Sequence, residues 1–217
     1  MAKMSKNKKF VLVLALLLTI AGAACLLYQQ MMTPASVFPS VTLTYTDGTS
    51  KTYSASNSPQ QILLDPSNSK TIASIKCDIH SVLTYTGTLT GFGISGTMVG
   101  YLYDASSSSL IATLWSKTLA VTYGSVSSGV DTVVLSETLT ATQIQGYYSG
   151  WQNNKEYYYV VYAPNKLTVK ANFSDGTSQS ATVDPLHLSV KVKYSGGGTL
   201  QTVSISFVGS ATYAPWV

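Results

Sequence analysis

Residues 186–207 read LHLSVKVKYSGGGTLQTVSISF, and this stretch decides the fold class of the chain. In its first half, apolar side chains occupy every second position: Leu186, Leu188, Val190, Val192 and Tyr194. The positions between them are polar: His187, Ser189, Lys191 and Lys193. Three glycines (196–198) then reverse the chain, and the second half places Val203, Ile205 and Phe207 on the apolar face. A period of two indicates strands with one buried face, so the stretch predicts an antiparallel hairpin.

Two more hairpins are indicated by turns of the same sequence, Asp-Gly-Thr-Ser, at residues 47–50 and 175–178. Alternating apolar residues precede each turn: Val41, Leu43 and Tyr45 in the first case, and Leu167, Val169, Ala171 and Phe173 in the second. Asp-Gly is a strong hairpin signal, so Asp47 and Asp175 are interpreted as turn residues. The repeat is either a duplicated module or hairpin chemistry used twice in one domain. We favour the second interpretation, because too few residues follow the second copy for another sandwich.

Further β-rich runs lie between these hairpins, and only residues 141–147 show a helical pattern after the N-terminal region. The runs cover residues 71–86, 98–104, 110–115, 131–139 and 156–162. The last of them, EYYYVVY, predicts a central strand with apolar contacts on both faces. We therefore predict an all-β fold, an antiparallel β-sandwich of jelly-roll or immunoglobulin-like kind over residues 41–217, preceded by one N-terminal hydrophobic helix.

The N-terminal region has the layout of a membrane-targeting segment. A basic flank at residues 1–9 carries four lysines, and residues 10–28 are free of charge. We predict a transmembrane helix or signal segment over residues 10–28, with its apolar length represented by Phe10, Leu14, Leu18, Gly22 and Leu27. The helix is either retained as an anchor or removed by cleavage near its small residues 21–24. Residues 29–40, with two prolines, predict an extended tether.

Phe10 directly after Lys8 and Lys9 gives the N-terminus a similarity to type IV prepilins. Such proteins have a short basic leader, an apolar helix and a β-rich head. The resemblance implies leader removal before Phe10. Lys9 stands where a glycine or alanine is usual in that family, and Leu14 stands where many bacterial members have glutamate.

The charge distribution excludes several classes of partner. The formal net charge of +4 comes from the four lysines of the basic flank, since nine lysines and nine acidic residues follow residue 9. The chain has no arginine, the residue that best contacts phosphates and guanine. A neutral body without arginine indicates no nucleic-acid partner. The layout instead places the β domain outside the cytoplasm, on a cell or virion surface.

Candidate catalytic groups are few. Asp78 and His80 lie two apart on one strand face, where they could orient a base for a serine nucleophile, although a solvated or interface-facing strand face is the simpler interpretation. His187 is predicted to be exposed on the polar face of its hairpin unless the domain forms oligomers through that face. The stretch GFGISG at residues 91–96 fits the glycine spacing of a dinucleotide loop, but another strand follows it, so a glycine-rich hairpin or bulge loop is predicted.

No metal, cofactor or enzymatic activity is expected from the remaining groups. The two histidines have no ligand spacing, and Cys77 alternates with isoleucines, which predicts a buried, inert thiol. Cys25 lies in the apolar segment, so no disulfide is expected. Glu137 and Glu156 are the two glutamates, and no carboxylate pair is evident from the sequence.

Asn172, in the sequence Asn-Phe-Ser, is the one predicted N-glycosylation acceptor. It alternates onto the polar face beside the second Asp-Gly turn. Candidate sugar-stacking residues are Trp115, Trp151, Trp216, Tyr147 and Tyr148.

These observations predict a non-enzymatic structural surface protein that is anchored or exported and assembles with copies of itself, in a filament, an envelope layer or a virion. An apolar tether such as residues 25–38 could add as a strand to a neighbour's sheet. In layout and composition the chain resembles β-rich surface-filament and virion proteins of thermophilic archaea. The alternative is an extracellular module that binds glycans or a host surface, favoured if three or more aromatic residues share an exposed patch. A secreted hydrolase would require an Asp–His–Ser set or two carboxylates in one cleft.

Overall fold

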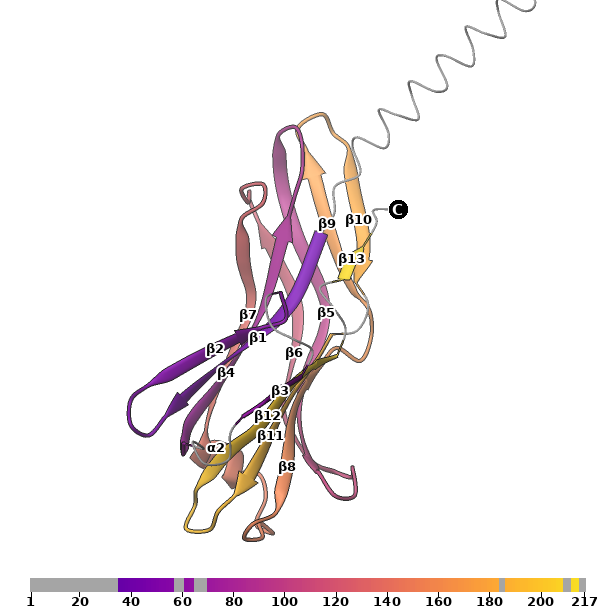
Figure 1. Cartoon of the computed structure of the whole chain (residues 1–217). Helices are drawn as coiled ribbons and strands as arrows, with labels where there is room; N and C mark the ends of the chain where they lie inside the picture. Colours follow the sequence, from indigo (N-terminus) through magenta and orange to yellow (C-terminus); the bar gives the residue numbers. More distant parts are fainter. Residues whose placement is uncertain (1–34, 57–60, 65–69, 184–185, 209–211, 215–217) are drawn as a thin grey trace, which may run out of the picture.

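The computed structural model describes residues 35–56, 61–64, 70–183, 186–208 and 212–214. These residues form thirteen strands and one short helix, so the all-β prediction is confirmed. The strands make two antiparallel sheets (Figure 1). The predicted N-terminal helix, with Phe10, Leu14, Leu18, Gly22 and Leu27, lies outside the described residues.

The smaller sheet, called sheet A, has the order β13-β1-β4-β7, with β2 also paired to β1. Its strands are β1 (Ala35–Tyr45), β2 (Ser50–Ser54), β4 (Ile72–Leu83), β7 (Asp131–Thr140) and β13 (Thr212–Ala214). Strand β1 is at its centre, because β4 pairs along its whole length on one side. On the other side β13 and β2 pair with different parts of β1.

The larger sheet, sheet B, has the order β10-β9-β5-β8-β11-β12-β3, with β6 also paired to β5. Its strands are β3 (Gln61–Leu63), β5 (Leu89–Asp104), β6 (Leu110–Tyr123), β8 (Glu156–Tyr162), β9 (Leu167–Phe173), β10 (Ser178–Val183), β11 (His187–Tyr194) and β12 (Leu200–Val208). Strand β8 lies between β5 and β11, so the predicted central strand is confirmed.

Strand β5 pairs with three other strands of sheet B. Along one edge it pairs with β6, and along the other edge it pairs first with β9 and then with β8. In Figure 1, β9 and β10 lie beside one end of β5, and β8 and β11 lie beside the other end. The change of partner falls at Gly96, whose φ of +143° favours glycine. A Cβ atom there would lie 2.5 Å from Cδ2 of Leu167, the first residue of β9.

One hydrophobic core takes side chains from both sheets. The predicted alternation is confirmed in β1, β9 and β11, whose inward positions are buried except for the last ones, Tyr45, Phe173 and Tyr194, which are half-buried. The core includes Val37, Val41, Leu43, Ile75, Cys77, Ile79 and Leu139 from sheet A, and Phe92, Ile94, Leu102, Tyr157, Tyr159, Leu167, Val169, Val190 and Ile205 from sheet B. A period of two thus brings one face of each strand into a shared interior.

The two Asp-Gly-Thr-Ser hairpins close in the same way, one in each sheet. Asp47 accepts hydrogen bonds from the backbone N–H and the hydroxyl of Thr49, and Asp175 accepts the equivalent pair from Thr177. Gly48 and Gly176 have positive φ angles of 82° and 85°. These contacts lower the pKa of the Asp175 carboxyl, and Lys70 together with Thr49 lowers that of Asp47. The turn interpretation of both aspartates is confirmed.

Two segments differ from their sequence predictions because neighbouring strands pair with them. Residues 35–40, predicted as part of the tether, are extended but form the first half of β1, with Val37 fully buried. The body of the fold therefore begins before residue 41. The glycine-rich segment 91–96, predicted as a loop, lies within β5. Its glycines permit close neighbours, such as the Val121 carbonyl oxygen 3.2 Å from where a Gly93 Cβ would be.

The last hairpin, formed by β11 and β12, contains a bulge that the alternation did not reveal. Lys191 is opposite Ser204 and Val192 is opposite Thr202, so Val203 is an extra residue on β12. Val203, predicted on the apolar face, is consequently only half-buried. Thr202 and Ser204 are buried in its place.

The single described helix, α2 (Ala141–Gly146), confirms the helical pattern predicted there. Thr140 caps it, with its hydroxyl accepting from the Gln143 backbone N–H at 3.1 Å. The Gln143 side chain accepts from the Thr140 N–H in return, which completes a capping box.

Candidate functional site

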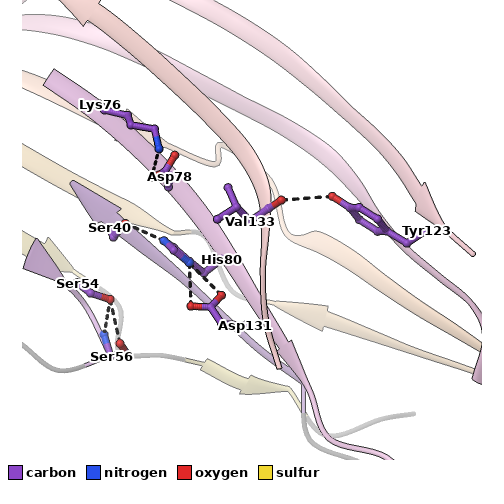
Figure 2. A network of polar contacts seen from close by, with 9 residues as sticks. All are labelled: Ser40, Ser54, Ser56, Lys76, Asp78, His80, Tyr123, Asp131 and Val133. Carbon is purple, nitrogen blue, oxygen red and sulfur yellow. Dashed lines mark hydrogen bonds and ion pairs between the residues drawn. The ribbon is translucent and has the colours of Figure 1, made fainter. Parts of the chain in front are cut away.

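A serine, a histidine and an aspartate from three strands meet on the outer face of sheet A (Figure 2). Oγ of Ser40 on β1 lies 2.8 Å from Nε2 of His80 on β4. Nδ1 of His80 lies 2.9 and 3.0 Å from the carboxylate oxygens of Asp131, the first residue of β7. Because a carboxylate only accepts, Nδ1 of His80 carries a proton and donates to Asp131, and Nε2 is the ring atom that shares a hydrogen bond with the Ser40 hydroxyl. We call this arrangement the Ser40–His80–Asp131 network.

The surroundings hold the histidine ring in place. The ring of Phe38 stacks on that of His80, with centroids 5.1 Å apart and planes within 1°. Asp78 stands opposite Ser40 in the β1–β4 register and is only 7% exposed. Its Oδ2 atom lies 2.9 Å from Nζ of Lys76, and its Oδ1 atom has no partner among the described residues. This part of the outer face is thus packed rather than solvated.

The network has the order of atoms that nucleophilic catalysis uses: a hydroxyl, a histidine base and a carboxylate that orients the base. Two features of Ser40 oppose that use. The residue is only 3% exposed, so an acyl substrate has little access to its hydroxyl. Ser40 also lies in mid-strand between β2 and β4, where backbone N–H groups serve the sheet ladders rather than an oxyanion.

The sequence identified His80 but not its partners. Asp78 and His80 do share one strand face, as predicted, but His80 pairs with Asp131, so the proposed Asp78–His80 pair is wrong. Of the two interpretations predicted for this face, the solvated one is wrong at Asp78, which is buried, and the interface-facing one stays a prediction. Asp131 lies 51 positions and Ser40 lies 40 positions from His80 in the chain, and no local pattern marks either residue.

The other titratable candidates are separated from one another. Glu137 on β7 forms an ion pair with Lys117 on β6, and Glu156 on β8 pairs with Lys191 on β11 at 3.1 Å. Cys77 is buried, as predicted, and burial raises the pKa of its thiol to about 12. Within the described ranges, no group of histidine, cysteine and acidic side chains is arranged to hold a metal ion.

The four predicted stacking residues within the described part of the chain do not form one exposed patch. Trp115 packs against the core and donates from Nε1 to the Tyr159 hydroxyl at 2.9 Å. Trp151 is half-buried, packs edge-on against Tyr148 and donates from Nε1 to the Gln145 carbonyl at 3.0 Å. Tyr147 is 45% exposed. Trp216 lies outside the described residues.

An aromatic groove that the sequence did not indicate lies on the outer face of sheet B. It has a volume of about 500 Å³, and we call it the tyrosine groove. Its lining residues come from β5, β8, β11, β12 and one loop: Tyr101, Tyr103, Ser108, Tyr158, Val160, Tyr162, His187, Ser189 and Ser206. The available signal was the period of two in residues 101–103 and 158–162, which places alternate tyrosines on one face.

His187 belongs to this groove rather than to an exposed hairpin face. Its ring packs edge-on against Tyr162, with centroids 5.9 Å apart. Burial lowers the pKa of His187, and its Nε2 atom has no partner among the described residues. The predicted exposure of His187 is therefore wrong.

Asn172 lies on β9 with its side chain exposed, on the polar face predicted for it. The geometry leaves this asparagine accessible, and its glycosylation stays a prediction. The membrane-segment residues Phe10, Leu14, Leu18, Gly22 and Leu27 fall outside the described part of the chain. Within the described part, no helix has the length and apolarity needed to span a bilayer.

No protein-family model matches this chain, and neither a curated protein nor a solved structure shows significant similarity to it. Its function is therefore inferred from the chemistry of its own residues.

Proposed function

We propose that this protein is a non-enzymatic structural component of a cell or virion surface that assembles with copies of itself. In this proposal the N-terminal segment targets the chain to a membrane or anchors it there, and the β body stands outside the cytoplasm. The body is a β-sandwich of jelly-roll or immunoglobulin-like kind. The shared core of the two sheets supports the sandwich, and the balanced charge after residue 9 supports a body without an anionic partner.

The observation that carries the proposal is the outer edge of β6. This strand has 14 residues and pairs with β5 on one side. Among the described residues, no strand pairs with its other side. An open edge of this length presents backbone donors and acceptors to any strand that approaches, and soluble monomers usually block such edges.

Features that prevent another strand from pairing with β6 occur only in its first part. Ile111 and Leu114 are extra residues relative to β5, so residues 110–114 are bulged. From Trp115 to Tyr123 the register is regular, with no proline and a single charge, Lys117. That charge is neutralised by Glu137 of the same chain. The regular part of the edge is therefore suited to accept a strand from a second copy.

Not every segment of the chain is free to pair with the β6 edge of a second copy. Residues 35–38 already pair with β4 of their own sheet, so they are not free to join a neighbour, as the tether hypothesis required. Pairing between two β6 edges is the simplest alternative, because a two-fold axis makes one patch complementary to itself.

The burial of Ser40 supports a structural role for the Ser40–His80–Asp131 network. Ser40 is only 3% exposed, and the hydrogen bonds of the network connect β1, β4 and β7. Such links stabilise sheet A without requiring a substrate.

The test is the self-association of the full-length protein in mild detergent, measured by sedimentation equilibrium. Thr118→Lys adds a second charge to the regular part of the β6 edge and should weaken association about tenfold, or about 1.4 kcal/mol. Thr168→Lys is the matched control, since Thr168 is also exposed but lies on β9, which is paired on both sides. The N-terminal segment is unchanged in both variants. A monomeric wild type, or equal association of both variants and wild type, would contradict the proposal.

A further inference from the structure

The tyrosine groove has an apolar floor and aromatic walls. Tyr103 on β5 stands directly opposite Tyr158 on β8, and Tyr101 stands opposite Val160. Val160 is buried beneath the groove. Tyr162 lies opposite His187 of β11, so the wall continues onto a third strand. Side chains at facing positions on neighbouring strands lie close together, and these tyrosines therefore form a continuous surface.

Apart from the His187 ring, the polar side-chain groups of the groove are hydroxyls. Among the described residues, the hydroxyls of Tyr101, Tyr103 and Tyr162 take part in no hydrogen bond. Ser189 and Ser206 stand opposite each other on β11 and β12 and add two more hydroxyls. Each hydroxyl donates one hydrogen bond and accepts others, so the groove matches a ligand rich in hydroxyl groups.

The groove is also electrically neutral. No lysine, aspartate or glutamate lines it. His187 contributes no charge at neutral pH because burial lowers its pKa. Beside the groove, Nζ of Lys191 lies 5.2 Å from the centroid of the Tyr158 ring, but this lysine forms an ion pair with Glu156. An anionic ligand would find no unpaired cation among the lining residues, which disfavours phosphates, sulfates and carboxylates.

A ligand for this groove must therefore be neutral, with apolar faces to stack on tyrosine rings and hydroxyls around its rim. Sugar rings have this composition. Tyrosine suits such contacts, because it offers a rigid apolar ring and a polar tip at small entropic cost. The volume of about 500 Å³ lies within the usual range for ligand sites.

We propose that the tyrosine groove is a binding site for neutral carbohydrate, contacted by Tyr101, Tyr103, Tyr158 and Tyr162. The sugar rings stack on the tyrosines, and the hydroxyls of Tyr101, Tyr162, Ser189 and Ser206 bond to the rim of the sugar. The site does not depend on self-assembly, since β6 does not line it.

The experiment uses full-length protein in a detergent without a sugar headgroup, which would otherwise compete. The probes are short neutral oligosaccharides of glucose, mannose and N-acetylglucosamine, an acidic galacturonic acid oligomer, and a proline-rich peptide as the alternative occupant of an aromatic groove. Binding is measured by saturation-transfer NMR and then by calorimetry. We expect at least one neutral oligosaccharide to bind and the acidic oligomer not to bind.

Variants locate the binding. Tyr101→Ala and Tyr162→Ala should each weaken sugar binding at least tenfold, and Tyr147→Ala, an exposed tyrosine outside the groove, should leave it unchanged. If circular dichroism shows that an alanine variant is unfolded, Tyr101→Phe and Tyr162→Phe replace it in the binding test. These variants keep the ring and remove the hydroxyl, so they should still weaken sugar binding. Failure of every neutral oligosaccharide to bind, binding of the peptide alone, or full binding by the folded tyrosine variants overturns the proposal. Because β6 is intact throughout, these results are independent of the self-association test.

Discussion

Oγ of Ser40 and Nε2 of His80 lie 2.8 Å apart although 40 positions separate the two residues in the chain. The register of β1 against β4 produces this contact. Phe38 is directly opposite His80, and Ser40 is directly opposite Asp78, so the serine and histidine meet on the diagonal of one sheet face. Asp131 approaches the other side of the ring from β7. The result resembles a catalytic triad in its order of atoms while remaining enclosed.

The enclosure of Ser40 predicts that it does not react as a nucleophile. Full-length protein treated with a fluorophosphonate probe should show no modification of Ser40 by peptide mass spectrometry, because the hydroxyl is almost fully buried. Wild type and Ser40→Ala should hydrolyse a small aryl ester at the same rate. Labelling of Ser40 that disappears in His80→Ala would show that the network is catalytic.

The same hydrogen bond predicts a measurable contribution to stability. Ser40→Ala removes the partner of His80 Nε2 and should lower the free energy of unfolding by about 1 kcal/mol in urea titrations. Ser180→Ala on β10, where the serine is exposed, should change it by less than about 0.5 kcal/mol. Equal effects of the two substitutions would mean that the network contributes nothing.

The position of His187 predicts a loss of stability at mildly acidic pH. Burial holds its pKa in the folded protein below the ordinary value of 6.5. As pH falls through 6.5, the unfolded chain therefore takes up a proton first, and the free energy of unfolding decreases until the folded pKa is passed. His187→Gln should lose this part of the pH dependence. The difference between wild type and variant between neutral and mildly acidic pH isolates His187 from His80, and a constant difference would refute the prediction.

Cys77 is predicted to be chemically silent in the folded state. Burial raises the pKa of its thiol to about 12, and the reactive thiolate is scarce at neutral pH. In a Cys25→Ser background, a disulfide reagent should label Cys77 only after unfolding in urea. Labelling of the native protein as fast as the unfolded chain would show that sheet A opens readily.

Gly100 on β5 is predicted to be intolerant of any side chain. A Cβ atom there would lie 2.3 Å from Nε1 of Trp115, so Gly100→Ala must displace the indole and break its bond to Tyr159. We expect a loss of about 1–3 kcal/mol in the free energy of unfolding. Gly124→Ala, with no neighbour within 4 Å, is the matched control and should be nearly neutral. A neutral Gly100→Ala would show that Trp115 is free to move.

Much of the fold was predictable because side-chain alternation and turn chemistry are local. Strand β8 was predicted with the observed bounds, and the two Asp-Gly turns adopt the predicted role. Local patterns failed where a neighbouring strand changed the outcome. Residues 91–96 were predicted as a loop but form a strand, because β6 and β9 pair with them on either side. Val203 was predicted on the apolar face but is only half-buried, because a bulge shifts the register of β12.

Three properties of this protein could be derived from its sequence alone: antiparallel strands, a buried thiol at Cys77 and a balanced charge after residue 9. These are properties of neighbouring residues and of composition, which need no knowledge of the partner strand. Two further properties depend on the three-dimensional fold: Ser40, His80 and Asp131 meet, and tyrosines of β5 and β8 share a groove with His187. Pairing between distant strands is selected by the burial of the whole core, so no local pattern encodes it.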